Sequence, residues 1–139
     1  MLYDPTMVAP MQQEVSELGF AECQTAEDVD SHLKGYNGSA LVFVNSVCGC
    51  SAGSARPALR LALESGAPAP EKLLTVFAGQ SPEATKRARD YFIGYQPSSP
   101  CMAVLKAGEV VHIIERWQIE GQSPESVARS LVWAFNKFC

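Results

Sequence analysis

Two short runs of apolar, β-branched residues place the strongest constraint on how this chain folds. Residues 41–44 and 73–77 have the composition of buried strands, and turn-forming residues precede each run. A helical pattern of leucines lies between them at residues 59–63, and Gly66 with two prolines ends it. Strands that are separated by helices pair in parallel, so the two runs predict an α/β fold.

The rest of the chain adds elements to both ends of this unit. Apolar spacing and capping residues predict helices at about 8–18, 25–35, 81–92 and 123–138, and strands at 20–23, 101–105 and 109–114. The last two strands are joined by only three residues, so they pair antiparallel. We therefore expect one α/β domain over residues 1–139, with a mixed β-sheet and helices on both faces.

Composition and charge exclude several classes of protein. The net charge is −4 and the basic residues are scattered, so no nucleic-acid-binding surface is expected. The apolar runs are far shorter than the roughly 20 residues that cross a membrane, and the N-terminus lacks the pattern of a signal peptide. A cytoplasmic location is the expectation. In that reducing compartment the five cysteines are not expected to form permanent disulfides, and a close pair such as Cys48 and Cys50 more often serves redox chemistry, catalysis or metal binding.

The segment Cys48-Gly49-Cys50 lies between a predicted buried strand and a predicted helix. Ligands bind at this edge of an open α/β sheet, and free backbone N–H groups there favour a thiolate. Pro57 leaves two positions open for the start of the helix. The helix begins near Cys50 and bends at Pro57, or it begins at Ser54 and leaves the cysteines in a loop that the helix dipole reaches less.

The single residue between the two cysteines favours a transient disulfide. A Cys-X-Cys ring is small and strained, which makes the bond easier to reduce. We expect Cys48 to be the attacking thiol and Cys50 the resolving thiol. Two alternatives remain: inert cysteines in a tight turn, or a thiolate site for a metal or an iron–sulfur cluster. Cys101 is a third possible ligand of such a site, but no fourth is evident and no metal is expected.

Several short motifs of the chain carry a resemblance to a known family. They are NSVCGCSAGSARPA, TVFAGQ, SSP and IEG, together with the C-terminal cysteine. The resemblance is to the bacilliredoxin family, within the thioredoxin-like superfamily. It implies a thioredoxin-like fold in which Pro100 follows a cis peptide bond and Ser99 contacts the substrate. It also implies that Cys48 removes bacillithiol from mixed disulfides on client proteins. Bacillithiol is then a thiol co-substrate and no cofactor is needed. Some family members are described as disulfide isomerases, which is the alternative activity.

Two departures from thioredoxin set this chain apart. Val47 stands where thioredoxins carry tryptophan, and Val42 replaces their buried acid. Cys101 follows the expected cis-proline and is a candidate third thiol, or a passive cysteine at the start of a strand. Further candidates are the cysteines at 23 and 139 and four residues that either line the site or are ordinary surface and packing residues: Arg56, Tyr95, Arg116 and Trp117.

Overall fold

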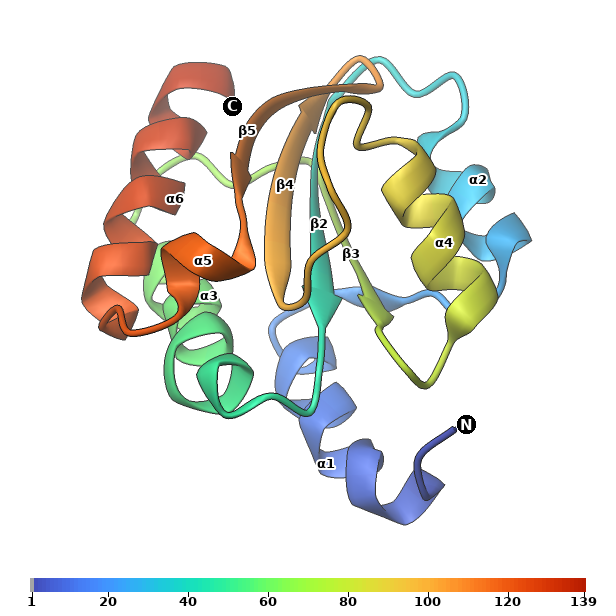
Figure 1. Ribbon diagram of the computed structural model, residues 1–139. Coiled ribbons are helices and arrows are strands. Elements are labelled where there is room, and N and C mark those ends of the chain that lie inside the picture. The colour runs from blue at the N-terminus through green and yellow to red at the C-terminus, as the bar shows by residue number, and fades with distance from the viewer. Residues whose placement is uncertain (1) are drawn as a thin grey trace.

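A five-stranded mixed sheet organises the chain, as the strand pattern predicts (Figure 1). The computed structural model describes residues 2–139. The strands are β1 (Ala21–Glu22), β2 (Ser39–Asn45), β3 (Lys72–Phe77), β4 (Cys101–Lys106) and β5 (Glu109–Ile114), and their order in the sheet is β1-β3-β2-β4-β5. β1, β3 and β2 are parallel, whereas β4 is antiparallel to β2 and to β5. The predicted hairpin therefore extends one side of a parallel sheet.

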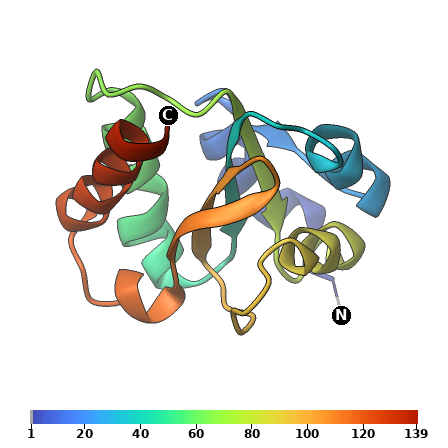
Figure 2. The ribbon, with the colours of Figure 1, turned by 90° about the horizontal axis from the view of Figure 1, so that it is seen from above.

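Helices cover both faces of this sheet (Figure 2). α2 (Ala26–Leu33) packs on α4 (Pro82–Asp90) on one face, and α3 (Arg56–Leu63) packs on α6 (Pro124–Phe138) on the other. α1 (Pro5–Ser16) precedes β1, and the short α5 (Arg116–Ile119) joins β5 to α6. No helix in the described part of the chain has the length and apolar character to cross a membrane.

The sequence marks where these helices begin. Thr25 caps α2 in a capping box with Asp28, and the Ser123 side chain accepts the Ser126 N–H at the start of α6. Proline occupies the first turn of both α4 and α6, where the missing N–H has no helical partner. These local signals explain why the helix starts are predicted well from sequence.

Strand β2 lies at the centre of the sheet, and all seven of its residues are buried. Leu41 and Phe43 face the hydrophobic core under α3 and α6, whereas Val42 and Val44 face the core under α2 and α4. Side chains of a strand alternate between the two faces, so a strand that is covered on both sides reads as a continuous apolar run. The end of β2, which leads to Cys48, is therefore held rigidly between two cores.

The structure decides between the two helix starts that Pro57 leaves open. The chain becomes helical at Gly49, passes through a π-helical turn at Ser51–Ala55 and continues as α3, with Pro57 in the first turn of α3. Proline has no N–H and its ring crowds the carbonyl four residues earlier, and the wider turn accommodates this defect. The helix thus starts beside the cysteines. α5 was not predicted, and the helix predicted to reach residue 92 ends at Asp90.

Candidate active site

Cys48 and Cys50 lie side by side at the end of β2. Their Sγ atoms are 2.8 Å apart, which is hydrogen-bonding contact and longer than the roughly 2.05 Å of a disulfide bond, and both are free thiols. The Cys48 carbonyl accepts the N–H groups of Ser51 (3.0 Å) and Ala52 (3.4 Å), so Cys48 is the residue from which the helix starts. Both cysteines are half-buried. The positive end of the helix therefore lies at the Cys48 sulfur.

The pKa values of the two thiols shift in opposite directions. The hydrogen bond from the Cys50 thiol lowers the pKa of Cys48, and the backbone N–H groups of Cys50 and Ser51 and the charge of Arg116 act in the same direction against the effect of burial. Burial raises the pKa of Cys50 to about 11, and the hydrogen bond to Cys48 and the negative charge on Cys48 add to this rise. When the pair loses one proton, the favoured arrangement is therefore a Cys48 thiolate that accepts a hydrogen bond from a protonated Cys50.

A buried arginine fastens the loop that carries these cysteines. Only 4% of Arg56 is exposed. Its Nη1 donates to Asn45 Oδ1 (2.9 Å), the Ser46 carbonyl (3.1 Å) and Ser51 Oγ (3.2 Å), and its Nε donates to Glu14 Oε2 (2.9 Å). The expectation that Arg56 lines the site or is an ordinary surface residue was wrong, because its side chain is buried and lies outside the lining of the Cys48 cavity. Arg56 ties the two sides of the cysteine loop to each other and to α1.

A cavity of about 330 Å³ opens beside Cys48. Ser99 and Arg116, which the sequence suggested, line it together with Cys48. Arg116 Nη1 donates to the Ser99 carbonyl at 3.3 Å. The other residues that line this cavity are Tyr3, Ser46, Val47, Ala78, Gly79 and Arg89. The start of β4, the end of β2 and the start of α5 thus meet at one edge of the sheet (Figure 1).

The Ser99–Pro100 peptide bond is cis, as the resemblance implied. Pro100 is buried and Ser99 is half-buried, so it is Ser99 that faces the cavity beside Cys48. Ser99 already engages Arg116 through its carbonyl. The predicted segment is therefore next to the cysteine pair, whereas its contact with a substrate stays a prediction.

The other cysteines differ from the pair. Cys101 is buried beside Val44 in the sheet, and burial raises the pKa of its thiol to about 12. Cys23 is buried as well, and burial raises its pKa to about 11. Cys139 is exposed at the end of the chain. Neither Cys101 nor Cys23 has the exposure or the thiolate character of a reactive cysteine.

Sequence reasoning missed Arg89, Gly79 and Tyr3, which come from three separate segments and line the same cavity. Gly79 has a φ of +87°, and a Cβ atom there would lie 2.7 Å from the Tyr3 ring, so only glycine fits this close approach. The sequence TVFAGQ contains this glycine, but the ring that packs on it is 76 residues away in the chain. Tyr95 lines a neighbouring cavity, which shares Gly79 and Arg89 with the cavity of Cys48. Trp117 is 72% exposed and lines neither cavity.

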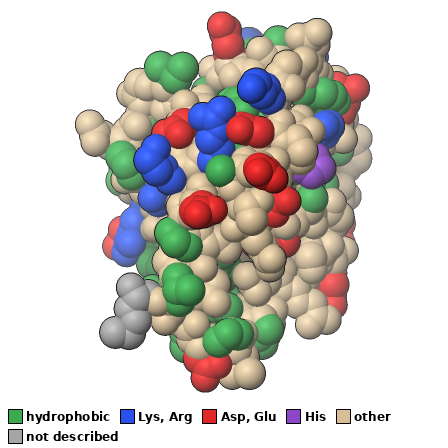
Figure 3. Space-filling model, turned by 90° about the vertical axis from the view of Figure 1, so that its right-hand side faces the viewer, with side chains coloured by type: hydrophobic (Ala, Val, Ile, Leu, Met, Phe, Trp, Pro, Cys, Tyr) green, Lys and Arg blue, Asp and Glu red, His purple; other side chains and the backbone are tan. Residues whose placement is uncertain are grey.

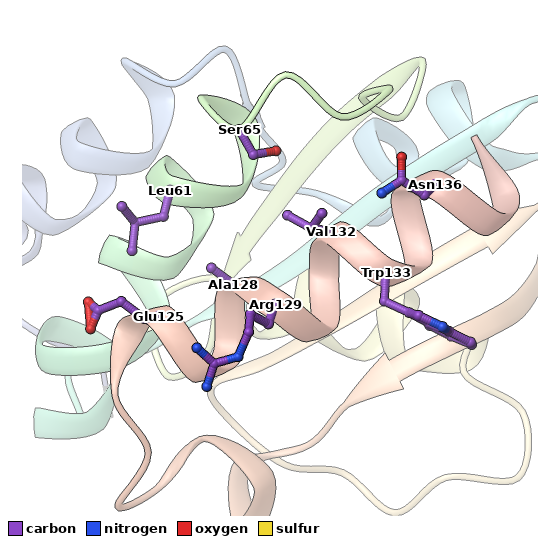
Figure 4. Close-up of a pocket in the computed structure, with 8 residues that line it drawn as sticks. All are labelled: Leu61, Ser65, Glu125, Ala128, Arg129, Val132, Trp133 and Asn136. Carbon is purple, nitrogen blue, oxygen red and sulfur yellow. The ribbon is translucent and has the colours of Figure 1, made fainter.

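A second depression lies between α3 and α6, away from the cysteines (Figure 4). It has a volume of about 500 Å³ and is lined by Leu61, Ser65, Glu125, Ala128, Arg129, Val132, Trp133 and Asn136. No nucleophilic cysteine lines it, so its chemistry does not match that of the cysteine pair.

A metal site requires ligands that converge. Within residues 2–139 no group of three or more His, Cys, Asp and Glu side chains lies close enough to hold a metal ion. Cys101 does not form such a group with Cys48 and Cys50. The cysteine pair therefore lacks the four-ligand set of a structural zinc site or an iron–sulfur cluster.

Comparison with known proteins assigns the family. Residues 3–139 match the protein family described as disulphide isomerase. A bacilliredoxin of Geobacillus kaustophilus is 50% identical over 137 residues, which cover 99% of this chain and 94% of the relative. A bacilliredoxin of Staphylococcus aureus is 49% identical over 138 residues, with 99% and 94% covered.

Solved structures agree on the fold. A structure described as having a thioredoxin fold matches with a TM-score of 0.60 at 14% identity, over 86% of this chain and 96% of the other. Malassezia sympodialis thioredoxin matches with a TM-score of 0.56 at 13% identity, over 86% and 90%. The matching family and the relatives support a thiol–disulfide oxidoreductase. The chain has a thioredoxin-like fold and belongs to the bacilliredoxin family.

Proposed function

We propose that this protein removes a low-molecular-weight thiol, with bacillithiol as the expected one, from mixed disulfides on client proteins. The observation that carries the proposal is the cysteine pair itself. Cys48 and Cys50 are in hydrogen-bonding contact, their pKa values shift in opposite directions, and Cys48 faces a cavity. A lowered pKa provides the thiolate that attacks a disulfide, and the cavity provides space for the small thiol.

The first step transfers the small thiol to Cys48. The Cys48 thiolate attacks the sulfur of the small thiol within the mixed disulfide. A new disulfide forms between Cys48 and the small thiol, the bond to the client sulfur breaks, and the client leaves as a thiolate that takes a proton from solvent. The client is reduced in this step, and the small thiol stays oxidised on Cys48.

The second step releases the small thiol. Once Cys48 is part of a disulfide it carries no charge, so two of the effects that raise the pKa of Cys50 disappear. The Cys50 thiolate then attacks the Cys48 sulfur, a Cys48–Cys50 disulfide forms, and the small thiol leaves as a thiolate. Two further molecules of the small thiol reduce this disulfide and leave as their own disulfide, which restores both cysteines. No cofactor takes part in this cycle.

The proposal includes a cytoplasmic location and two kinds of partner. Thiolated client proteins supply the mixed disulfide, and the reduced small thiol is the co-substrate. Such a thiol pool is kept reduced in the cytosol, where permanent disulfides are rare. Ser99 is proposed to contact the client beside the cysteines, and the buried Pro100 is proposed to hold it in place.

The test is to follow the thiol on Cys48 by mass spectrometry. Incubation with a bacillithiolated client is expected to add the mass of bacillithiol to Cys48. The adduct should last longer in Cys50→Ser, which lacks the resolving thiol, and should not form in Cys48→Ser. An absence of adduct in Cys50→Ser, with the client still thiolated, would show that Cys48 is not the acceptor.

Isomerase activity on protein disulfides is a second candidate, favoured by the description of the matching family. It uses the same Cys48 thiolate, but both sulfurs of the attacked disulfide belong to the client. A scrambled disulfide-bonded substrate separates the two activities. Recovery of native pairings without any small thiol would support the isomerase, and dependence on the small thiol would support its removal from clients.

A further inference from the structure

Arg89 lies between two adjoining cavities, one of which contains Cys48. The cavity of Cys48 and a second cavity of about 420 Å³ share Gly79 and Arg89 among their lining residues. The second cavity continues along α4 and the loop that follows it, and its other lining residues are Pro82, Thr85, Lys86, Asp90, Tyr95 and Pro97. Arg89 therefore borders both cavities, and a molecule attached to the Cys48 sulfur lies in a cavity that Arg89 lines.

The hydrogen-bonding capacity of Arg89 is incompletely used. Its Nη2 donates to the Ser98 carbonyl at 3.3 Å, but its Nε is buried without an acceptor among the described residues. Thr85 Oγ1, on the adjoining cavity, is also buried without a partner. An unpaired buried polar group costs free energy, so such groups in folded proteins need an explanation. An acceptor on a ligand that reaches this donor would satisfy it.

The charges around Arg89 are otherwise neutralised. On the same helix Lys86 pairs with Asp90 (3.4 Å) and Arg87 pairs with Asp30 (2.7 Å), and the face over α2 and α4 shows basic and acidic side chains intermixed (Figure 3). Arg116, across the cavity, pairs with Glu120 at 3.3 Å. Within residues 2–139 no carboxylate lies within 4 Å of the Arg89 guanidinium. Arg89 is thus a cation next to the Cys48 cavity without a protein counter-charge.

We propose that Arg89 recognises a carboxylate of the small thiol that Cys48 takes from its clients, and so selects acidic low-molecular-weight thiols over neutral ones. This inference rests on the proposed function. A guanidinium presents its N–H groups in a planar fork that matches a carboxylate, and the free Nε–H is one arm of that fork. Arg89 selects which thiol is bound, and Cys48 and Cys50 carry out the sulfur exchange.

Matched pairs of thiols test this selection. A client peptide is thiolated either with 3-mercaptopropionate or with 2-mercaptoethanol, and in a longer pair with 6-mercaptohexanoate or 6-mercaptohexanol. The members of each pair differ only at the end away from the sulfur, which is a carboxylate in the acidic probe and a neutral hydroxyl or hydroxymethyl group in the other. The rate of client thiol release is measured for the wild type, Arg89→Gln and Lys86→Gln, and each variant's preference for the acidic probe is compared with that of the wild type.

For at least one pair, Arg89→Gln should lower the preference for the acidic probe roughly tenfold, the effect expected for one lost charged hydrogen bond. Its rate with the neutral probe should fall less than its rate with the acidic probe. Lys86→Gln should keep the preference, because Asp90 already neutralises Lys86. An equal loss with both probes, or no loss with either, would overturn the proposal.

The wild type provides a test that does not depend on a folded variant. Its preference for the acidic probes should exist at low salt and should decrease as salt screens the ion pair. If the wild type transfers both kinds of thiol to Cys48 without preference, the role of Arg89 is contradicted but the proposed function is not. A wild type that transfers neither kind of thiol to Cys48 contradicts the proposed function itself.

Discussion

Replacement of Arg56 by glutamine is the sharpest test of how the cysteine loop is held. The substitution removes a buried charged group that donates hydrogen bonds to the Ser46 carbonyl, Asn45 Oδ1 and Ser51 Oγ. Asn45 Oδ1 keeps two other donors, the Ser46 N–H and the Ser51 hydroxyl. The main loss is therefore at the Ser46 carbonyl and at Glu14, with a vacant volume left where the guanidinium packed.

The magnitude follows from these contacts. Loss of a charged donor to a buried acceptor costs about 1.5–3 kcal/mol, and removal of one partner from a buried charged network costs about 3–5 kcal/mol. Because Glu14 is 41% exposed, we take the lower end. The free energy of unfolding should fall by about 3 kcal/mol, and the melting temperature of a domain of this size by about 10 °C.

Glu14→Gln is the matched control. It removes the charge at the other end of the same interaction, but the carboxylate is partly solvated, so the expected loss is below about 1 kcal/mol. Urea unfolding followed by far-UV circular dichroism gives both values. In parallel, the rate of iodoacetamide alkylation at Cys48 should change in Arg56→Gln, because Ser46 and Ser51 flank that cysteine. If Glu14→Gln costs as much as Arg56→Gln, or if Arg56→Gln costs less than about 1 kcal/mol, the buried network does not hold the loop.

Three further predictions concern titrating groups. Cys50→Ala should move the midpoint of Cys48 alkylation to higher pH, and Cys50→Ser, which keeps a hydroxyl donor, should move it less; equal shifts would argue against the thiol–thiolate hydrogen bond. Cys101 should resist iodoacetamide until the protein unfolds, as read by mass spectrometry, because burial raises its pKa to about 12; native labelling as fast as at Cys48 would contradict this. Burial raises the pKa of Glu22 to about 7 from 4.5. A carboxyl with a raised pKa favours the folded state below its unfolded pKa, and this contribution is lost as pH rises through the folded pKa. Stability should therefore fall between about pH 4.5 and 7, and Glu22→Gln should flatten that slope in urea unfolding; an unchanged slope would refute the assignment.

The cysteine pair shows how far local sequence reaches. The sequence places Cys48 and Cys50 after a buried strand, and the structure confirms that position. The sequence leaves the helix start undecided at Pro57, because a proline is compatible with a first turn or with a bend. A π-helical turn before α3 resolves this, and it depends on how the whole segment packs under α6.

Arg56 and Arg89 show where local reasoning ends. Both look like ordinary charged residues of helices, which are solvated in most proteins. Two of the partners of Arg56 lie on β2 and α1, and the cavity beside Arg89 is also lined by Tyr3 and Ser99. Such long-range contacts leave no periodic signal in the sequence. The short α5 is not predicted from the sequence for a different reason: four residues are too few to show a helical period.

The sequence by itself determined the α/β class, the order of the main strands and helices, the helix caps and the position of the two cysteines. Those features depend on the alternation of side chains along a strand and on residues within a turn of one another. Only the tertiary structure decided which thiol is stabilised as a thiolate, that Arg56 is buried beneath the cysteine loop, and that Arg89 faces the Cys48 cavity without a counter-charge. Charge stabilisation and burial depend on distances between residues that are far apart in the chain, and folding alone sets those distances.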